Sequence, residues 1–87
     1  MEEKKRFDLD VEIDGFKDRG ENACVCYANV LEKFGLDLNK DTDNPIVKNY
    51  DELIKLLNDA YKIETYEDLD KAEARMIELW KFCNEFL

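Results

Sequence analysis

The residues of this chain whose types and spacing could support chemistry are its carboxylates and its three cysteines. Histidine, serine and glutamine are absent. Neither a Ser/His nor a Cys/His nucleophile pair can therefore be built. Pairs of Asp and Glu can perform acid–base catalysis alone, but no pair stands out by its spacing. We therefore predict that the protein is not an enzyme and has no cofactor.

Residues 10–21 match much of the EF-hand calcium loop. Acidic side chains fall at loop positions 1, 3, 5, 9 and 12 and Gly15 at position 6, which suits hard oxygen ligands around a sharp turn. Lys17 stands where the loop needs an apolar residue, and Val11 extends an apolar alternation instead. A calcium-binding module remains an alternative function. The acids concerned are Asp10, Glu12, Asp14, Asp18 and Glu21.

A second group of oxygen-bearing side chains lies in the middle of the chain. It consists of Asp37, Asn39, Asp41 and Asp43. The position that would need glycine in a calcium loop is Thr42, and Asp and Asn are also common in turns. We predict a turn here rather than a metal site.

The cysteines are Cys24, Cys26 and Cys83, an odd number that argues against a disulfide framework. Zinc would need all three thiolates and a carboxylate, because no histidine is available. We expect buried, reduced thiols that behave as small apolar side chains, and no metal site. No apolar run follows the basic N-terminus and none approaches the length of a membrane span, so we expect a cytoplasmic protein.

Charge dominates the composition of this 87-residue chain, with 13 Lys and Arg against 22 Asp and Glu and a net charge of −9. Such a charge repels nucleic acid and anionic membranes. It favours a basic protein partner, including one whose normal ligand is nucleic acid. The length predicts a single domain spanning residues 1–87, and the apolar content of 45% is sufficient for a packed core.

The elements that must position these side chains begin with an alternating segment. Phe7, Leu9, Val11 and Ile13 alternate with Asp8, Asp10, Glu12 and Asp14. This period of two predicts a β-strand over about residues 6–14, ended by a turn at Gly15. The four acids would then form a row on the solvent-exposed face of the strand, with neighbouring acids about 6.6 Å apart.

Helical spacing follows over about residues 19–34, where Asp18 and Glu21 could form a capping box. Gly35 lies where a helix would end in a Schellman motif, with Leu36 able to contact Leu31. Residues 22–29 also have strand-like composition and could instead form a hairpin with the first strand.

Two further helices are expected after a loop at residues 36–48. One covers about residues 50–62, with Asn49 and Glu52 as its capping box, and the other covers about residues 66–86, with Thr65 as its cap. The predicted fold is therefore α+β and dominated by helices, with one N-terminal strand or hairpin and two or three helices.

Candidate partner-binding residues fall into three groups: the strand acids, the acidic start of the last helix, and aromatic residues too numerous for one small core. An exposed aromatic patch is typical of an interface. The residues are Asp8, Asp10, Glu12, Asp14, Glu64, Glu67, Asp68, Asp70, Trp80 and Phe86.

These features predict a non-enzymatic, acidic module that binds and regulates or inhibits a basic, nucleic-acid-binding partner. The most specific version of this prediction is a nucleic-acid mimic, such as a phage-type anti-CRISPR or anti-restriction inhibitor. We expect no direct binding of nucleic acid or membrane. Besides calcium binding, the remaining alternative is a structural subunit that forms a homodimer.

Overall fold

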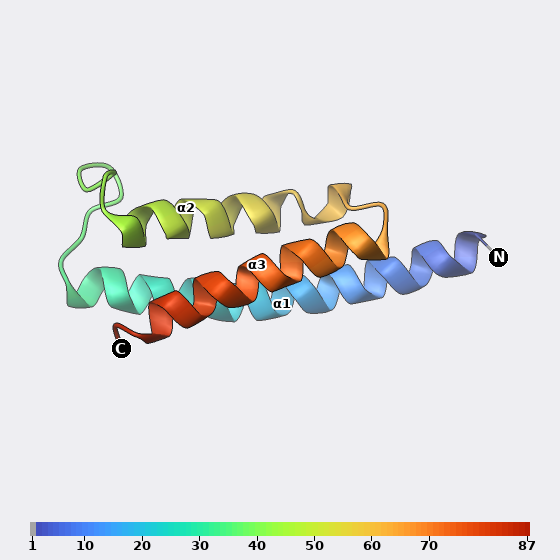
Figure 1. The fold of residues 1–87 in the computed structure, drawn as a ribbon, viewed down its shortest axis with the longest axis horizontal. Coiled ribbons are helices and arrows are strands. Elements are labelled where there is room, and N and C mark those ends of the chain that lie inside the picture. The colour runs from blue at the N-terminus through green and yellow to red at the C-terminus, as the bar shows by residue number, and fades with distance from the viewer. Residues whose placement is uncertain (1) are drawn as a thin grey trace.

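The chain is built from helices in the computed structural model, which describes the backbone of residues 2–87 and the side chains of residues 8–87. Three α-helices, α1 (Glu2–Lys33), α2 (Pro45–Asn58) and α3 (Tyr66–Asn84), are joined by loops and one 3-10 turn, η1 (Ala60–Lys62) (Figure 1). No strand occurs among the described residues. The fold is thus all-α, and the prediction of an α+β fold is wrong.

Helix α1 runs through both segments that were predicted as possible strands, residues 6–14 and 22–29. Its inward positions follow one another at alternating intervals of four and three residues, the seven-residue repeat of a helix packed along a bundle. A lone strand would leave its backbone N–H and C=O groups without partners, whereas a helix pairs these groups within itself. Burial of the seven-residue repeat therefore favours a helix over a strand. The inward residues are Leu9, Ile13, Phe16, Gly20, Ala23, Tyr27 and Val30.

The predicted Schellman ending of α1 is confirmed. Gly35 has a φ of 63°, its N–H donates to the carbonyl of Glu32, and the N–H of Leu36 donates to the carbonyl of Leu31 at 2.9 Å. Glycine tolerates this left-handed conformation without the clash a Cβ would cause. The predicted capping box of Asp18 lies inside the helix and does not form.

Helix α2 begins earlier than predicted. The side chain of Asn44 accepts a hydrogen bond of 2.8 Å from the N–H of Ile46, and Pro45 occupies the first turn, where its missing N–H costs nothing. Asn49 therefore lies inside α2 rather than at its cap.

Helix α3 begins as predicted at its cap, Thr65, whose hydroxyl accepts a hydrogen bond of 3.1 Å from the N–H of Asp68. The helix ends at Asn84, two residues before the predicted boundary.

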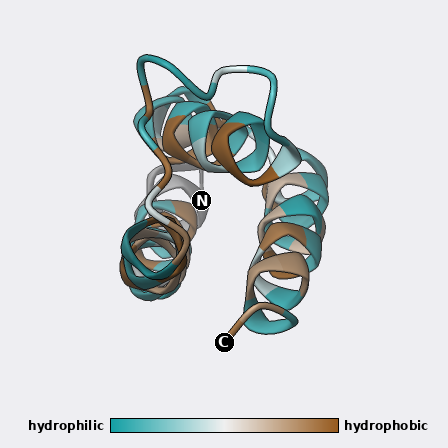
Figure 2. Ribbon diagram, turned by 90° about the vertical axis from the view of Figure 1, so that its left-hand side faces the viewer, coloured by the Kyte–Doolittle hydropathy of each residue, from teal (hydrophilic) through white to brown (hydrophobic). Residues whose placement is uncertain are grey.

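The three helices run up, down and up, so that α1 and α3 are parallel and α2 is antiparallel to both (Figure 1). Seen end-on, α2 lies over the other two helices, and hydrophobic faces turn toward the middle (Figure 2). The 32 residues of α1 correspond to a length of about 48 Å, close to the 50 Å long axis of the molecule. One core joins all elements, including Leu53 of α2 and Met76 of α3. None of the described helices is long and apolar enough to cross a membrane.

Candidate interaction surfaces

The predicted row of acids along residues 8–14 does not exist, because these residues are helical. Successive residues of an α-helix are rotated by about 100°, so alternate acids point in nearly opposite directions. Asp8 and Glu12 lie one turn apart on one face, while Asp14 faces η1 and accepts a hydrogen bond of 3.0 Å from the hydroxyl of Tyr61. Asp10 is half-buried.

Asp8 and Glu12 lie beside the start of α3, where they influence Tyr66. Partial burial raises the pKa of the Tyr66 hydroxyl, and the two carboxylates raise it further. Tyr66 is 43% exposed, so it presents an amphipathic surface next to both acids. Sequence reasoning missed Tyr66. Its place directly after the cap Thr65, among acids, was the only signal for it.

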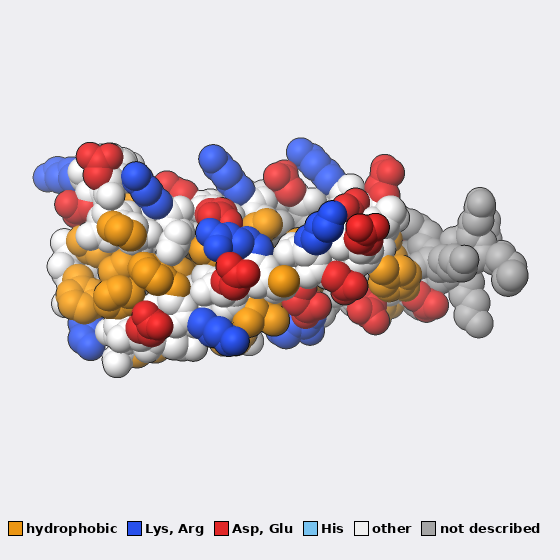
Figure 3. Space-filling model, viewed as in Figure 1, with side chains coloured by type: hydrophobic (Ala, Val, Ile, Leu, Met, Phe, Trp, Pro, Cys, Tyr) orange, Lys and Arg blue, Asp and Glu red, His pale blue; other side chains and the backbone are white. Residues whose placement is uncertain are grey.

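The start of α3 adds more carboxylates to this end of the molecule. Together they form what we call the acidic end: Asp8, Glu12, Glu64, Glu67, Asp68 and Asp70. All six side chains are exposed, and Figure 3 shows acidic side chains gathered where α3 begins. Glu67 pairs with Lys71 at 3.6 Å. In the described part of the chain, the other five take part in no ion pair.

Three carboxylates in the middle of the bundle, by contrast, pair with arginines. Arg19 of α1 pairs with Glu73 of α3. Arg75 donates to both oxygens of Glu52 across the α2–α3 interface, with Nη2 to Oε1 at 2.8 Å, and to Glu78 at 3.0 Å. The hydrogen bond from Arg75 lowers the pKa of Glu52. These ion pairs link α1 and α2 to α3.

Trp80 and Phe86 do not join the acids. Trp80 is half-buried against the core. Phe86 packs edge-on against Phe34 and Phe82, with ring centroids 6.0 and 5.1 Å apart. From Glu67 to Phe86 the rise along the helix corresponds to about 28 Å. The predicted partner-binding residues therefore belong to two separate surfaces.

We call the second surface the aromatic end: Phe34, Phe82, Phe86 and Leu87. Hydrophobic side chains gather at the opposite end of the molecule from the acidic end (Figure 3). Phe34 is 50% and Leu87 62% exposed. Lys33 secures the chain here, because its Nζ donates a hydrogen bond of 3.0 Å to the carbonyl of Phe86.

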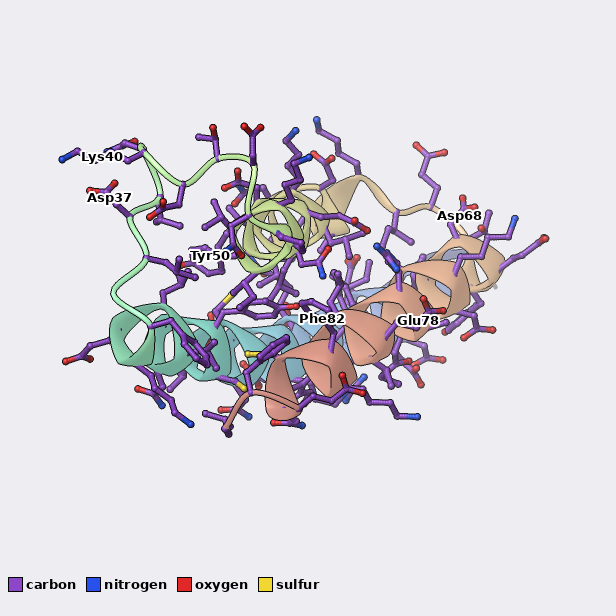
Figure 4. All side chains as sticks on the ribbon, turned by 60° about the vertical axis from the view of Figure 1, so that its left-hand side comes forward. Asp37, Lys40, Tyr50, Asp68, Glu78 and Phe82 are labelled. Carbon is purple, nitrogen blue, oxygen red and sulfur yellow. The ribbon has the colours of Figure 1, made fainter. Side chains whose placement is uncertain are left out.

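The two oxygen-rich segments that resembled cation sites have other structures. Residues 10–21 are continuous helix, which cannot wrap its side chains around one ion as an EF-hand loop does. In the loop before α2, Asp37 accepts hydrogen bonds from the backbone of Asn39 and Lys40, and Asp41 accepts one from the N–H of Asp37. The predicted turn is confirmed, and Figure 4 shows Asp37 and Lys40 at this loop, far from Asp68.

No group of three or more acids and cysteines is placed to hold a metal ion within the described residues. The structure does bring two cysteines together, since the sulfurs of Cys26 and Cys83 lie 3.0 Å apart in the core. Burial raises the pKa of Cys83 to about 12, and its hydrogen bond with Cys26 contributes. Cys24 is half-buried. The sequence contained no sign of this pairing, which depends on the register of α1 against α3.

Comparison of the chain with protein-family models, with curated proteins and with solved structures found no match.

Proposed function

We propose that the protein is a non-enzymatic binding module whose acidic end docks onto a basic protein partner. The observation that carries the proposal is the convergence of carboxylates from α1 and α3, which are more than fifty residues apart in the chain, around the exposed ring of Tyr66. Unpaired surface carboxylates raise the rate of encounter with a basic surface. Tyrosine is a favoured anchor once the surfaces meet.

The geometry also supports a partner whose normal ligand is nucleic acid. Asp8 and Glu12 are separated by a rise of about 6 Å along α1, and the acids of α3 follow a parallel helix beside them. A cationic groove that accepts rows of phosphates could accept these rows of carboxylates. In its sharpest form the module is a nucleic-acid mimic that inhibits such a partner, as phage-type anti-CRISPR and anti-restriction proteins would.

Affinity capture from the native host tests the proposal. The bait is wild-type protein, compared with a variant in which Asp8, Glu12, Asp68 and Asp70 are all changed to Lys. We expect the wild type to retain a basic protein that elutes with rising salt, and the variant to lose it. Circular dichroism of both baits checks that the helices are intact.

A matched control separates the acidic end from net charge. Changing Glu21, Glu32, Asp43 and Asp51 to Lys alters the net charge by the same amount at exposed positions elsewhere. If this control loses the partner equally, the acidic end is not the binding surface. If DNA or RNA fails to compete with the captured protein, the nucleic-acid-mimic form of the proposal is wrong.

The aromatic end supports a second candidate, a homodimer. Phe34 and Leu87 expose apolar surface beside Phe86, and such surface is typical of interfaces. Light scattering over a range of concentrations tests this candidate, with Phe34→Asp as the variant expected to stay monomeric. A wild-type protein that remains a monomer at the highest concentration would rule the homodimer out.

A further inference from the structure

Two of the three cysteines meet in the core, although they are 57 residues apart in the chain. The Sγ atoms of Cys26 in α1 and Cys83 in α3 are separated by 3.0 Å, about 1 Å more than a covalent disulfide of about 2.05 Å. Bond formation therefore requires the two sulfurs to approach by about 1 Å. Cys24 is rotated away from this contact, because it lies two residues before Cys26 on the same helix.

The pair lies near the end of a helix. Cys83 is one residue from the end of α3. Helix ends open more readily than helix centres. Cys26 is 6% exposed and Cys83 is fully buried, and opening of this last turn would move Asn84 away from the Cys26 sulfur. The amide oxygen of Asn84 lies 3.4 Å from the sulfur of Cys26 and covers it in the closed state.

We propose that Cys26 and Cys83 are a redox modification site, at which a peroxide oxidises the two thiols to a reversible disulfide that links α1 to the end of α3. The proposal is independent of the proposed function of the acidic end.

The reaction balances in two steps. The sulfur of Cys26 attacks one oxygen of the peroxide, the O–O bond breaks, and the thiol proton leaves with the second oxygen as water when the oxidant is hydrogen peroxide. Cys26 is now a sulfenic acid. The sulfur of Cys83 then attacks that of Cys26, so that an S–S bond forms, the S–O bond breaks, and the hydroxyl leaves with the proton of Cys83 as a second water. The two thiols lose two electrons and the peroxide gains them.

The disulfide would link α1 covalently to the part of α3 that contributes to the aromatic end. Phe82 and Phe86 flank Cys83 in α3 and the turn after it, and Phe86 contacts Phe34 of α1. In the reduced protein this contact depends on packing and on the hydrogen bond from Lys33. In the oxidised protein a covalent bond holds it, so oxidation would stabilise this surface.

The experiment treats the full chain with hydrogen peroxide, in slight excess over protein and without reductant. We expect the intact mass to fall by two hydrogen atoms and the melting temperature to rise by at least about 10 °C, because the bond closes a long loop. Dithiothreitol should reverse both changes. Trypsin, cleaving after Arg19, Lys33 and Lys81, should yield peptides 20–33 and 82–87 joined by the disulfide.

Peptide 20–33 holds both Cys24 and Cys26, so the Cys24→Ala variant is the matched control, and it should respond to peroxide like the wild type. Cys26→Ala should not gain the internal bond. The proposal is overturned if the wild-type bond joins Cys24, if it joins two chains, or if mass only increases through oxygen addition. The peptide map of the wild type decides the question even if Cys26→Ala fails to fold.

Discussion

Gly20 of α1 lies so close to Leu57 of α2 that a Cβ at position 20 would stand 2.2 Å from Cδ2 of Leu57. Gly20 is fully inside the bundle, at one of the inward positions of the seven-residue repeat. A glycine inside a helix costs about 1 kcal/mol of helix stability relative to alanine. Here the absence of a Cβ lets α1 and α2 approach closely.

We predict that Gly20→Ala lowers the free energy of unfolding by about 1 kcal/mol. The added methyl displaces the Leu57 side chain from a packed site, which typically costs about 1–3 kcal/mol, while the gain in helix propensity returns about 1 kcal/mol. Urea unfolding followed by circular dichroism measures the difference.

Gly15 supplies the control, because a Cβ there meets only the end of the Arg19 side chain, at 3.4 Å. Gly15→Ala should therefore stabilise the protein by about 0.5–1 kcal/mol. In a Leu57→Ala background Gly20→Ala should become stabilising too. If Gly20→Ala stabilises the wild type as much as Gly15→Ala does, the close approach is not a constraint.

A second prediction concerns Tyr27, a fully buried residue whose hydroxyl donates a hydrogen bond of 2.6 Å to the carbonyl of Leu79. Tyr27→Phe should lower the free energy of unfolding by about 1 kcal/mol, because one hydrogen bond between α1 and α3 is lost. The control is Tyr50→Phe. Tyr50 stacks on Tyr27 with ring centroids 5.9 Å apart, and its hydroxyl makes no hydrogen bond within the described part of the chain. We therefore expect the free energy of unfolding to change by less than about 0.5 kcal/mol. Equal losses in the two variants would contradict the assigned role of the Tyr27 hydroxyl.

The same buried groups predict a loss of stability at alkaline pH. Burial raises the pKa of Tyr27 well above its ordinary value of 10.0, and raises that of Cys83 to about 12 from 9.0. The folded protein therefore keeps protons that the unfolded chain releases. The contribution of these protons to the free energy of unfolding is complete below pH 9. It decreases as the pH rises, by up to about 1.4 kcal/mol per pH unit for each group. Urea midpoints from pH 8 to 11 should fall, and less steeply in Tyr27→Phe between pH 10 and 11. An equal slope in both proteins would contradict this account.

The parts of the fold that the sequence predicts correctly depend on short-range contacts. Thr65 caps α3 and Gly35 ends α1 because each hydrogen bond joins residues within one or two turns. The strand prediction failed because the apolar alternation around Leu9 and Ile13 satisfies a helix as well as a strand. Val11, which completes the alternation, is 53% exposed and marks no buried face. The repeat that identifies α1 passes through Gly20, a position that no apolar pattern reveals.

The candidate surfaces, like the fold, were predictable only where they depend on residues close together in the sequence. The acids at the start of α3 follow from composition and helix capping. That Asp8 and Glu12 join them around Tyr66 depends on the packing of α1 against α3, which a single sequence does not specify. The separation of Phe86 from these acids follows from the same packing, and so does the meeting of Cys26 with Cys83.

The last prediction concerns the ion pair between Glu52 and Arg75. Because the hydrogen bond from Arg75 lowers the pKa of Glu52 below its ordinary value of 4.5, the pair stabilises the protein above that pH. Its contribution is lost as the pH falls through the lowered pKa. Both side chains are about 40% exposed, so screening by solvent limits the effect. Arg75→Met should cost about 0.5–1 kcal/mol at pH 7 in low salt, and less at pH 3.

Lys71→Met is the matched control for Arg75→Met. Lys71 pairs with Glu67 at 3.6 Å, but both side chains are more than 70% exposed, so its removal should change the free energy of unfolding by less than about 0.5 kcal/mol. Arg75 joins two helices through both oxygens of one carboxylate, and such two-point pairs are the stronger ones. Urea unfolding of the two variants at both pH values separates the contributions. If the cost of Arg75→Met is the same at pH 3 as at pH 7, the ion pair with Glu52 is not its source, and the arginine stabilises the bundle by packing alone.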